Sequence, residues 1–267
     1  MGFSFDGKKI VAVITGATQG IGLQILISLS KIIGKGSIIY IVGRDDKKLY
    51  ELSEDITNEN VKCTYWHIDF ENSDVEAYEK LGQAFKGDIM DENIDIIGIF
   101  HIAGNIGDIK IKAQDVVPRE SWDSHFKVNV SSMILLNNYL LKPIIHLKKE
   151  NISVIVSITS LLAIKSFPCF SQYSVGHAAR EAFFRSLAVE CPELKILSYS
   201  PGPVKTRLRD YVKNNAYDSG IREAFSDEKI SDISKQSLAP EATIGKLFEY
   251  LKNNDFQSGS RIDFFDI

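Results

Sequence analysis

Short apolar runs alternate with helical patterns along most of the chain, and this alternation restricts the fold more than any other feature. Residues 10–14 form a β-branched run that ends at a glycine-rich turn, and Ile21, Ile25 and Leu29 then recur at helical spacing. Further runs that fit strands covered on both faces are residues 37–42, 61–68, 94–100, 152–158 and 194–199. Regular alternation of strand and helix requires right-handed crossovers. We therefore predict an α/β fold, a single-domain doubly wound parallel sheet (Rossmann fold) with helices on both faces.

The 267 residues contain no composition break, linker or internal repeat, so we predict one domain over residues 1–267. Residues 205–238 form the exception, a polar and weakly patterned segment that follows a predicted strand. Segments at this place in open α/β sheets often cover the ligand crevice. We expect residues 205–238 to cover the substrate; the alternative is a solvated helical excursion.

Composition and charge exclude several classes of partner. The 31 Lys and Arg residues nearly balance the 35 Asp and Glu residues, which gives a net charge of −4 and no basic face for nucleic acid. Cys63, Cys169 and Cys191 lie far apart without a C-x-x-C spacing, which argues against disulfides and a zinc site. No apolar run approaches the ~18 residues of a membrane span, and we find no signal-peptide or myristoylation pattern. We expect a cytoplasmic protein without a metal, nucleic-acid or membrane partner.

A glycine-rich turn, TGATQGIG at residues 15–22, joins the first predicted strand to the first helix. Glycines there let the backbone approach a pyrophosphate at the helix N-terminus, although they could also serve the turn and its packing alone. The spacing TGxxxGIG differs from G-x-G-x-x-G and resembles that of the short-chain dehydrogenase/reductase family. The resemblance implies a nicotinamide-dependent oxidoreductase. The turn residues that would contact its cofactor are Gly16, Thr18, Gln19, Gly20, Ile21 and Gly22.

The end of the second predicted strand indicates which cofactor is bound. A carboxylate there holds a free ribose 2′-hydroxyl, whereas an arginine neutralises a 2′-phosphate, so Gly43 and Arg44 predict NADP(H). Asp45 and Asp46 follow at the start of a helix, where capping and the helix dipole explain them without a ligand. The further cofactor contacts that the resemblance implies are Asp69 beside the adenine and Ala103, Gly104, Pro201, Gly202, Val204 and Thr206.

The resemblance also implies a catalytic group in the second half of the chain. Ser160 ends a predicted strand and Tyr173 follows thirteen positions later, which is the family's spacing for these two residues. Carbonyl reduction needs an acid for the developing alkoxide, and a tyrosine phenol held by a serine hydroxyl can serve. Asn129 matches the family's helix asparagine that supports the proton relay. Each of these residues alone is equally compatible with an ordinary packing role.

Two positions depart from the family pattern. The family motif is Tyr-x-x-x-Lys, but Tyr173 is followed four positions later by His177. Both positions share a helix face, so His177 can reach the nicotinamide ribose, yet at pH 7 histidine is mostly neutral and lacks the lysine's charge. This favours a reductase, or a protein that has given up catalysis. His101 likewise replaces the first asparagine of the family's Asn-Asn-Ala-Gly, which removes an expected cofactor hydrogen bond.

Three segments resemble the sepiapterin reductase branch of the family, namely residues 104–108, 199–203 and 255–266. This resemblance implies reduction of a pterin side-chain carbonyl, as in tetrahydrobiopterin biosynthesis. It assigns Asp263 to the pterin, because one carboxylate accepts two adjacent N–H donors, and Phe170 to stacking on the ring. The alternatives for Asp263 and Phe170 are a solvent-facing position and core packing. Alternative functions are reduction of other dicarbonyls and a catalytically silent NADP(H)-binding regulator.

The family resemblance also implies a homodimer formed through two long predicted helices, residues 120–141 and 171–190. Both stretches carry many apolar residues. A second copy of the chain is therefore the expected protein partner, beside a small-molecule pterin substrate.

Overall fold

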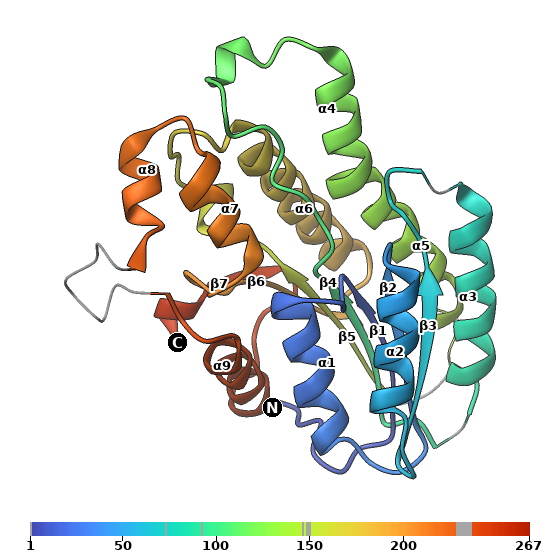
Figure 1. Cartoon of the computed structure of the whole chain (residues 1–267). Helices are drawn as coiled ribbons and strands as arrows, with labels where there is room; N and C mark the ends of the chain where they lie inside the picture. Colours follow the sequence, from blue (N-terminus) through green and yellow to red (C-terminus); the bar gives the residue numbers. More distant parts are fainter. Residues whose placement is uncertain (1, 73, 92, 146, 148–150, 228–236) are drawn as a thin grey trace.

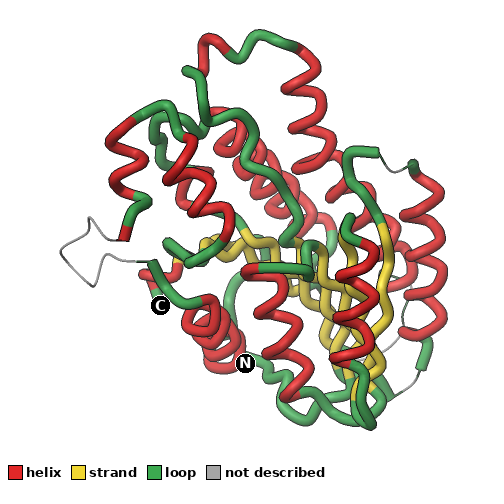
Figure 2. Tube along the Cα trace, viewed as in Figure 1, coloured by secondary structure: helices red, strands yellow, loops and turns green. Residues whose placement is uncertain are grey.

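The computed structural model describes residues 2–72, 74–91, 93–145, 147, 151–227 and 237–267. Within these residues seven strands form one sheet in the order β3-β2-β1-β4-β5-β6-β7, and every neighbouring pair is parallel (Figures 1 and 2). The strands are β1 (Ile10–Thr15), β2 (Ser37–Gly43), β3 (Val61–His67), β4 (Ile96–His101), β5 (Ile152–Ile158), β6 (Lys195–Ser200) and β7 (Ser260–Asp263). The predicted doubly wound parallel sheet is confirmed.

Helices cover both faces of this sheet. The described helices are α1 (Gly20–Ile32), α2 (Asp46–Ile56), α3 (Val75–Ile89), α4 (Arg119–Phe126), α5 (Ser132–Ile144), α6 (Ser171–Glu190), α7 (Arg207–Asn215), α8 (Ser219–Ala224) and α9 (Pro240–Asn253). Short helical turns are η1 (Ala113–Asp115), η2 (Lys127–Ser131), η3 (Leu161–Ala163) and η6 (Phe264–Asp266). In β1, Ile10, Ala12 and Ile14 face α1 and α9, whereas Val11 and Val13 face α3, α5 and α6. This alternation explains why the strands read as continuous apolar runs.

The strands before β4 are added on one side of β1 and the strands from β4 onward on the other side, and this reversal positions the site. From β1 the chain winds outward through β2 to β3, and it then crosses back to β4 on the other side of β1 (Figure 1). Loops that leave the carboxyl ends of β1 and β4 therefore diverge and leave a crevice between them, the usual ligand position in such sheets.

One predicted helix differs from the structure in its interior. Residues 120–141 were expected as a single helix, but a π-helical turn at Lys127–Ser131 separates α4 from α5. The predicted helix at residues 171–190 matches α6. Exposed apolar side chains on α5 and α6 include Leu135, Val175 and Val189, while the homodimer stays a prediction.

The segment expected to cover the substrate is described in part. Residues 205–227 form α7 and α8, and residues 228–236 lie outside the described part of the chain. Val212 of α7 and Ile221 of α8 pack with Phe170 in a small apolar cluster beside the sheet. The covering role of residues 205–238 stays a prediction.

Gly22 provides a test of the turn that the fold requires. A Cβ at Gly22 would lie 2.2 Å from the carbonyl oxygen of Gly16, which is backbone and cannot move aside. Gly22→Ala should therefore lower the free energy of unfolding by about 2 kcal/mol. Gly245→Ala is the matched control, because a Cβ there meets nothing within 4 Å and alanine favours helix by up to about 1 kcal/mol. Urea unfolding of both variants measures this, and equal stabilities would contradict the packing argument.

Candidate active site

The glycine turn after β1 is built for close backbone approach. Gly16 and Gly20 have φ angles of 71° and 55°, in the left-handed region that favours glycine. Gly16 N donates to Val42 O at 2.8 Å, and a Cβ on Gly16 would lie 3.0 Å from Ala103 N. No side-chain hydrogen bond caps the start of α1 within the described residues. The first N–H groups of α1 are therefore available to an anion.

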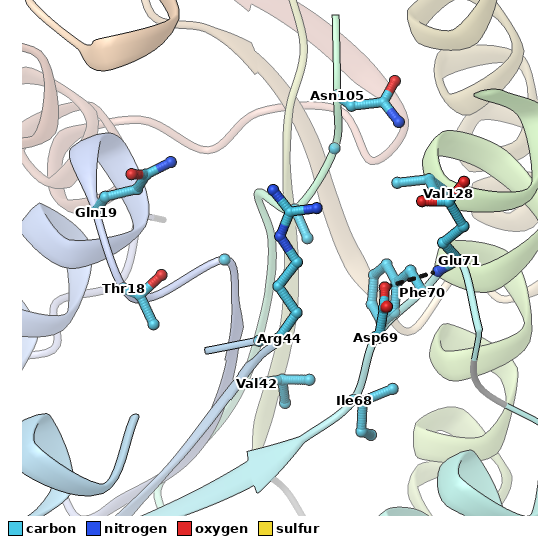
Figure 3. Close-up of a pocket in the computed structure, with 14 residues that line it drawn as sticks. Thr18, Gln19, Val42, Arg44, Ile68, Asp69, Phe70, Glu71, Asn105 and Val128 are labelled. Atoms are coloured by element: carbon cyan, nitrogen blue, oxygen red, sulfur yellow. Dashed lines mark hydrogen bonds between the residues drawn. The ribbon is translucent and has the colours of Figure 1, made fainter. Parts of the chain in front are cut away.

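A cavity of about 150 Å³ opens beside this turn, at the carboxyl ends of β1, β2, β3 and β4 (Figure 3). It is lined by Gly16, Thr18, Gln19, Val42, Gly43, Arg44, Ile68, Asp69, Phe70, Glu71, Ala103, Gly104, Asn105 and Val128. Seven of the residues predicted to contact the cofactor thus line one cavity. Thr206 lies against the other side of the turn, where its Cγ2 would be 3.3 Å from a Cβ on Gly20. Gly20, Ile21, Gly22, Pro201, Gly202 and Val204 are not among the lining residues.

Arg44 and Asp69 face each other across the cavity. The Arg44 side chain is exposed and extends into the middle of the cavity, between Thr18 and Asp69 (Figure 3). Hydrogen bonds from Asn72 and Glu71, with a smaller effect of the Arg44 charge, hold the pKa of Asp69 below its ordinary value. Asp45 accepts from Lys48 N at 3.1 Å and caps α2, as expected. Arg44, directly after β2, thus places a positive charge in the cavity, and its contact with a cofactor stays a prediction.

Asn129 lies in the π-helical turn and holds the loop after β4. Its Oδ1 accepts from Asn105 N at 2.9 Å, and its Nδ2 donates to Asn105 Oδ1 and His125 O at 3.0 Å each. A Cβ on Gly104 would lie 2.5 Å from Asn129 Oδ1, so this contact needs the glycine. Asn129 makes no hydrogen bond to His177 within the described residues. The structure therefore shows Asn129 as a support for the loop after β4, and its relay role stays a prediction.

Ser160 and Tyr173 lie at the carboxyl end of β5 and in the first turn of α6. Ser160 Oγ accepts from Leu162 N at 3.2 Å and caps the turn η3. Tyr173 packs on Phe170, with ring centroids 6.3 Å apart, and no hydrogen bond joins it to Ser160 among the residues described. Burial raises the pKa of Tyr173 to about 12, against an opposing effect of the Arg180 charge. At neutral pH Tyr173 is therefore an acid and not a base.

His177, the residue in place of the family's lysine, is buried and neutral. Its ring meets the Tyr173 ring edge to face, with centroids 4.3 Å apart and an interplanar angle of 72°. Burial lowers its pKa well below the ordinary value, with further effects of Arg180 and His125. Its Nδ1 is buried and has no hydrogen-bond partner within the described residues. An unpaired buried nitrogen beside Tyr173 fits a ribose hydroxyl as its missing partner.

His101, the second departure from the family pattern, points away from the cavity. Its side chain is fully buried, its Nε2 lies 3.1 Å from Asn137 Oδ1, and its ring packs on Phe184. Burial, with a smaller effect of Arg180, lowers its pKa to about 3. The loop after β4 is held instead by Thr15, whose Oγ1 accepts from the N–H groups of residues 102 and 103.

Phe170 and Asp263, the predicted pterin contacts, are both buried. Phe170 packs on Phe225 with ring centroids 5.7 Å apart. Asp263 ends β7, where it accepts from Phe265 N at 3.3 Å and pairs with Arg261 at 3.5 Å. Asp263 is 9% exposed, so the solvent-facing alternative is wrong.

Arg261 connects Asp263 to Ser160 at the end of β5, a link that the sequence did not predict. Its Nη2 donates to Ser160 O at 3.4 Å, and its Nε donates to Glu181 Oε1 at 3.2 Å. Glu181, buried on α6, also accepts from Thr159 Oγ1 at 2.6 Å. One ion-pair network therefore joins the ends of β5 and β7 to α6.

Comparisons with known proteins agree with this geometry. A family model described as short chain dehydrogenase matches residues 10–216. Sepiapterin reductase of Xenopus laevis is 28% identical over 224 residues, 83% of each chain, and that of Rattus norvegicus is 26% identical over 212 residues, 79% of this chain and 80% of the relative. The structure of L-sorbose reductase from Gluconobacter frateurii with NADPH and L-sorbose superposes with a TM-score of 0.76 at 20% identity, over 98% and 97% of the two chains. No helix in the described residues is long and apolar enough to cross a membrane.

His101 predicts a pH dependence of stability. The unfolded chain protonates this histidine near pH 6.5, whereas the folded protein does so only near pH 3, so the unfolded state binds more protons between these values. Stability should fall as the pH falls, and His101 alone accounts for about 2 kcal/mol between pH 7 and pH 5. In His101→Asn this loss should be smaller by that amount, measured by urea unfolding at both pH values. His67→Gln, at an exposed histidine, is the control and should leave the loss unchanged; equal losses in all three proteins would contradict the assignment.

Proposed function

The chain belongs to the short-chain dehydrogenase/reductase family, and from this membership we propose that it reduces the side-chain carbonyl of a pterin with NADPH. The observation that carries the proposal is the joint position of the three groups that such a reaction needs. Tyr173 is protonated in the first turn of α6, which packs against the turn η3 that Ser160 caps, and Asp263 is joined to the Ser160 carbonyl through Arg261. The sepiapterin reductases among its relatives support the same substrate class.

The cavity residues fit NADP(H). The glycines with positive φ and the uncapped start of α1 suit a pyrophosphate. The Arg44 guanidinium, in the same cavity, suits a 2′-phosphate. Asp45 caps α2 and does not line the cavity, whereas Arg44 does. When bound, NADPH supplies the hydride that carbonyl reduction consumes.

The chain's own residues complete the reaction. Tyr173 Oη donates a proton to the carbonyl oxygen, and Ser160 Oγ hydrogen-bonds to the same oxygen and holds it in place. Asp263 keeps free lone pairs beside its bonds to Arg261 and Phe265, so it can accept two N–H groups from the pyrimidinone edge of a pterin.

A catalytically silent NADP(H)-binding protein is the second candidate function, and the neutral His177 favours it. A carbonyl panel that includes sepiapterin and simple diketones separates the two candidates. The reductase proposal expects NADPH consumption with at least the pterin, whereas tight cofactor binding without consumption on any member supports the silent protein.

Cofactor choice is tested at Arg44. Arg44→Ala should weaken NADPH binding by about 10- to 100-fold, because a charge-assisted contact to the 2′-phosphate is lost, and should leave NADH binding nearly unchanged. Lys47→Ala is the matched control, since Lys47 is an exposed cation on α2 that does not line the cavity. Calorimetric titration of both cofactors measures these affinities. Equal affinities for NADPH and NADH in the unmutated protein would contradict the assignment.

Substrate choice is tested at Asp263. Asp263→Asn should raise the KM for sepiapterin about tenfold or more and leave the KM for a small diketone unchanged, because only the pterin offers N–H donors. Asp266→Asn is the control: Asp266 accepts from Asp263 N in the same turn, so this variant changes the turn and keeps the Asp263 carboxylate. Steady-state kinetics on both substrates decide the matter. Equal losses on sepiapterin and diketone would remove the pterin assignment.

A further inference from the structure

Arg180 is a buried cation on the same face of α6 as Tyr173 and His177. The three residues occupy positions i, i+4 and i+7, and Arg180 is 2% exposed. Its Nη2 donates to His101 O at 3.0 Å and contacts Ser157 Oγ at 3.4 Å, and its Nη1 donates to Ala103 O at 3.2 Å. Arg180 therefore binds the backbone at the end of β4, directly behind the cofactor cavity.

Arg180 carries a charge that no acidic side chain of the described residues balances. Within the described residues no carboxylate forms an ion pair with it, and its Nε has no hydrogen-bond partner. Glu181, its neighbour on the helix, pairs with Arg261 and Arg185 instead. Burial lowers the pKa of Arg180 to about 10, so it is still charged at neutral pH. An isolated buried cation is costly, and it stabilises any anion that forms close by.

Tyr173 is the group that becomes an anion near Arg180. Seven residues of helix separate the two Cα atoms by about 10 Å, and long side chains on a helix generally lean toward its N-terminus, which on α6 is the direction from Arg180 to Tyr173. Titratable groups on the elements around Tyr173 include His177, Arg180 and Glu181 on α6, His125 on α4, Asp108 after β4, Cys169 before α6 and Arg209 on α7. Of these, Arg180 is the one whose charge acts on the Tyr173 phenol. Both His125 and His177 have lowered pKa values and are neutral.

We propose that Arg180 is a positioning residue that supplies, from one turn further along α6, the positive charge that a lysine at position 177 would supply. The proposal rests on the proposed role of Tyr173 as the acid. During reduction the Tyr173 O–H bond breaks and a new O–H bond forms on the substrate oxygen, while NADPH provides the electron pair for the new C–H bond. The phenolate left on Tyr173 is stabilised by the guanidinium until it takes a proton from water.

The ionisation of Tyr173 tests this directly and needs no substrate. In full-length protein labelled with fluorinated tyrosine, whose phenols ionise at lower pH, fluorine NMR follows each tyrosine, and Tyr173→Phe identifies the signal of Tyr173. Arg180→Gln should raise the pKa of Tyr173 by about one unit, because a full charge about 10 Å away is lost. Arg185→Gln, at an exposed arginine on the same helix, should not shift it.

The direction of the shift separates an electrostatic role from a structural one. If Arg180 only held the loop after β4, its loss would admit water and lower the raised pKa of Tyr173 toward its ordinary value. An unchanged or lowered pKa in folded Arg180→Gln overturns the proposal, as does an equal rise in Arg185→Gln. The result is independent of the pterin assignment, which the kinetics at Asp263 test.

If Arg180→Gln does not fold, Ser157 offers a second route. Ser157→Asp places a carboxylate against the guanidinium and cancels its charge without removing Arg180, and Ser157→Asn makes the same change in size without charge. The pKa of Tyr173 should be about one unit higher in the aspartate variant than in the asparagine variant. Equal values in the two variants overturn the proposal.

Discussion

The close approach of β1 and β4 at their carboxyl ends is the constraint on which the site depends. The two strands pair from Ile10 to Thr15, and they part where Gly16 turns toward α1. A side chain at Gly16 would meet Ala103, and the Thr15 hydroxyl binds the backbone that follows β4. The two loops are therefore fixed to each other before they diverge, and these contacts hold the base of the cavity in place. Glycines in the turn are a packing requirement of the sheet as well as a property of the ligand site.

The same region concentrates buried basic groups on one side of the sheet. His177 and Arg180 lie on α6, Arg180 donates to His101 O at the end of β4, and all three side chains are buried. Low dielectric surroundings penalise each charge, so the two histidines stay neutral and the arginine alone keeps its proton. Replacing a lysine with histidine at position 177 therefore removes a second cation from beside Arg180. A neutral residue there avoids a repulsion that would cost stability.

The sequence predicted the fold and one end of the site because the strand runs and the glycine turn are patterns of residues that are close together in the chain. The apolar runs gave the strands, and the turn with Arg44 and Asp69 gave the cavity, since parallel strands bring their carboxyl ends to one edge. Arg180 and Arg261 were not predicted. Arg261 meets Glu181 across 80 positions, and no periodicity encodes such a pairing. The π-helical turn was also missed, because its apolar pattern continues that of the flanking helices.

A protein cannot change the equilibrium of the reaction that it catalyses, but the ionisation of its acid decides what fraction of each substrate complex is in the reactive form at a given pH. In the reaction proposed above, oxidation requires the Tyr173 phenolate and reduction requires the phenol. With a pKa of about 12, Tyr173 is almost wholly phenol at neutral pH. The form that reduction needs is therefore abundant, and the phenolate that oxidation needs is scarce. Arg180 acts on the phenolate from a greater distance than a lysine at position 177 would. Arg180 therefore stabilises the Tyr173 phenolate that forms during reduction, while Tyr173 stays protonated before the reaction. This suits a chain that works as a reductase.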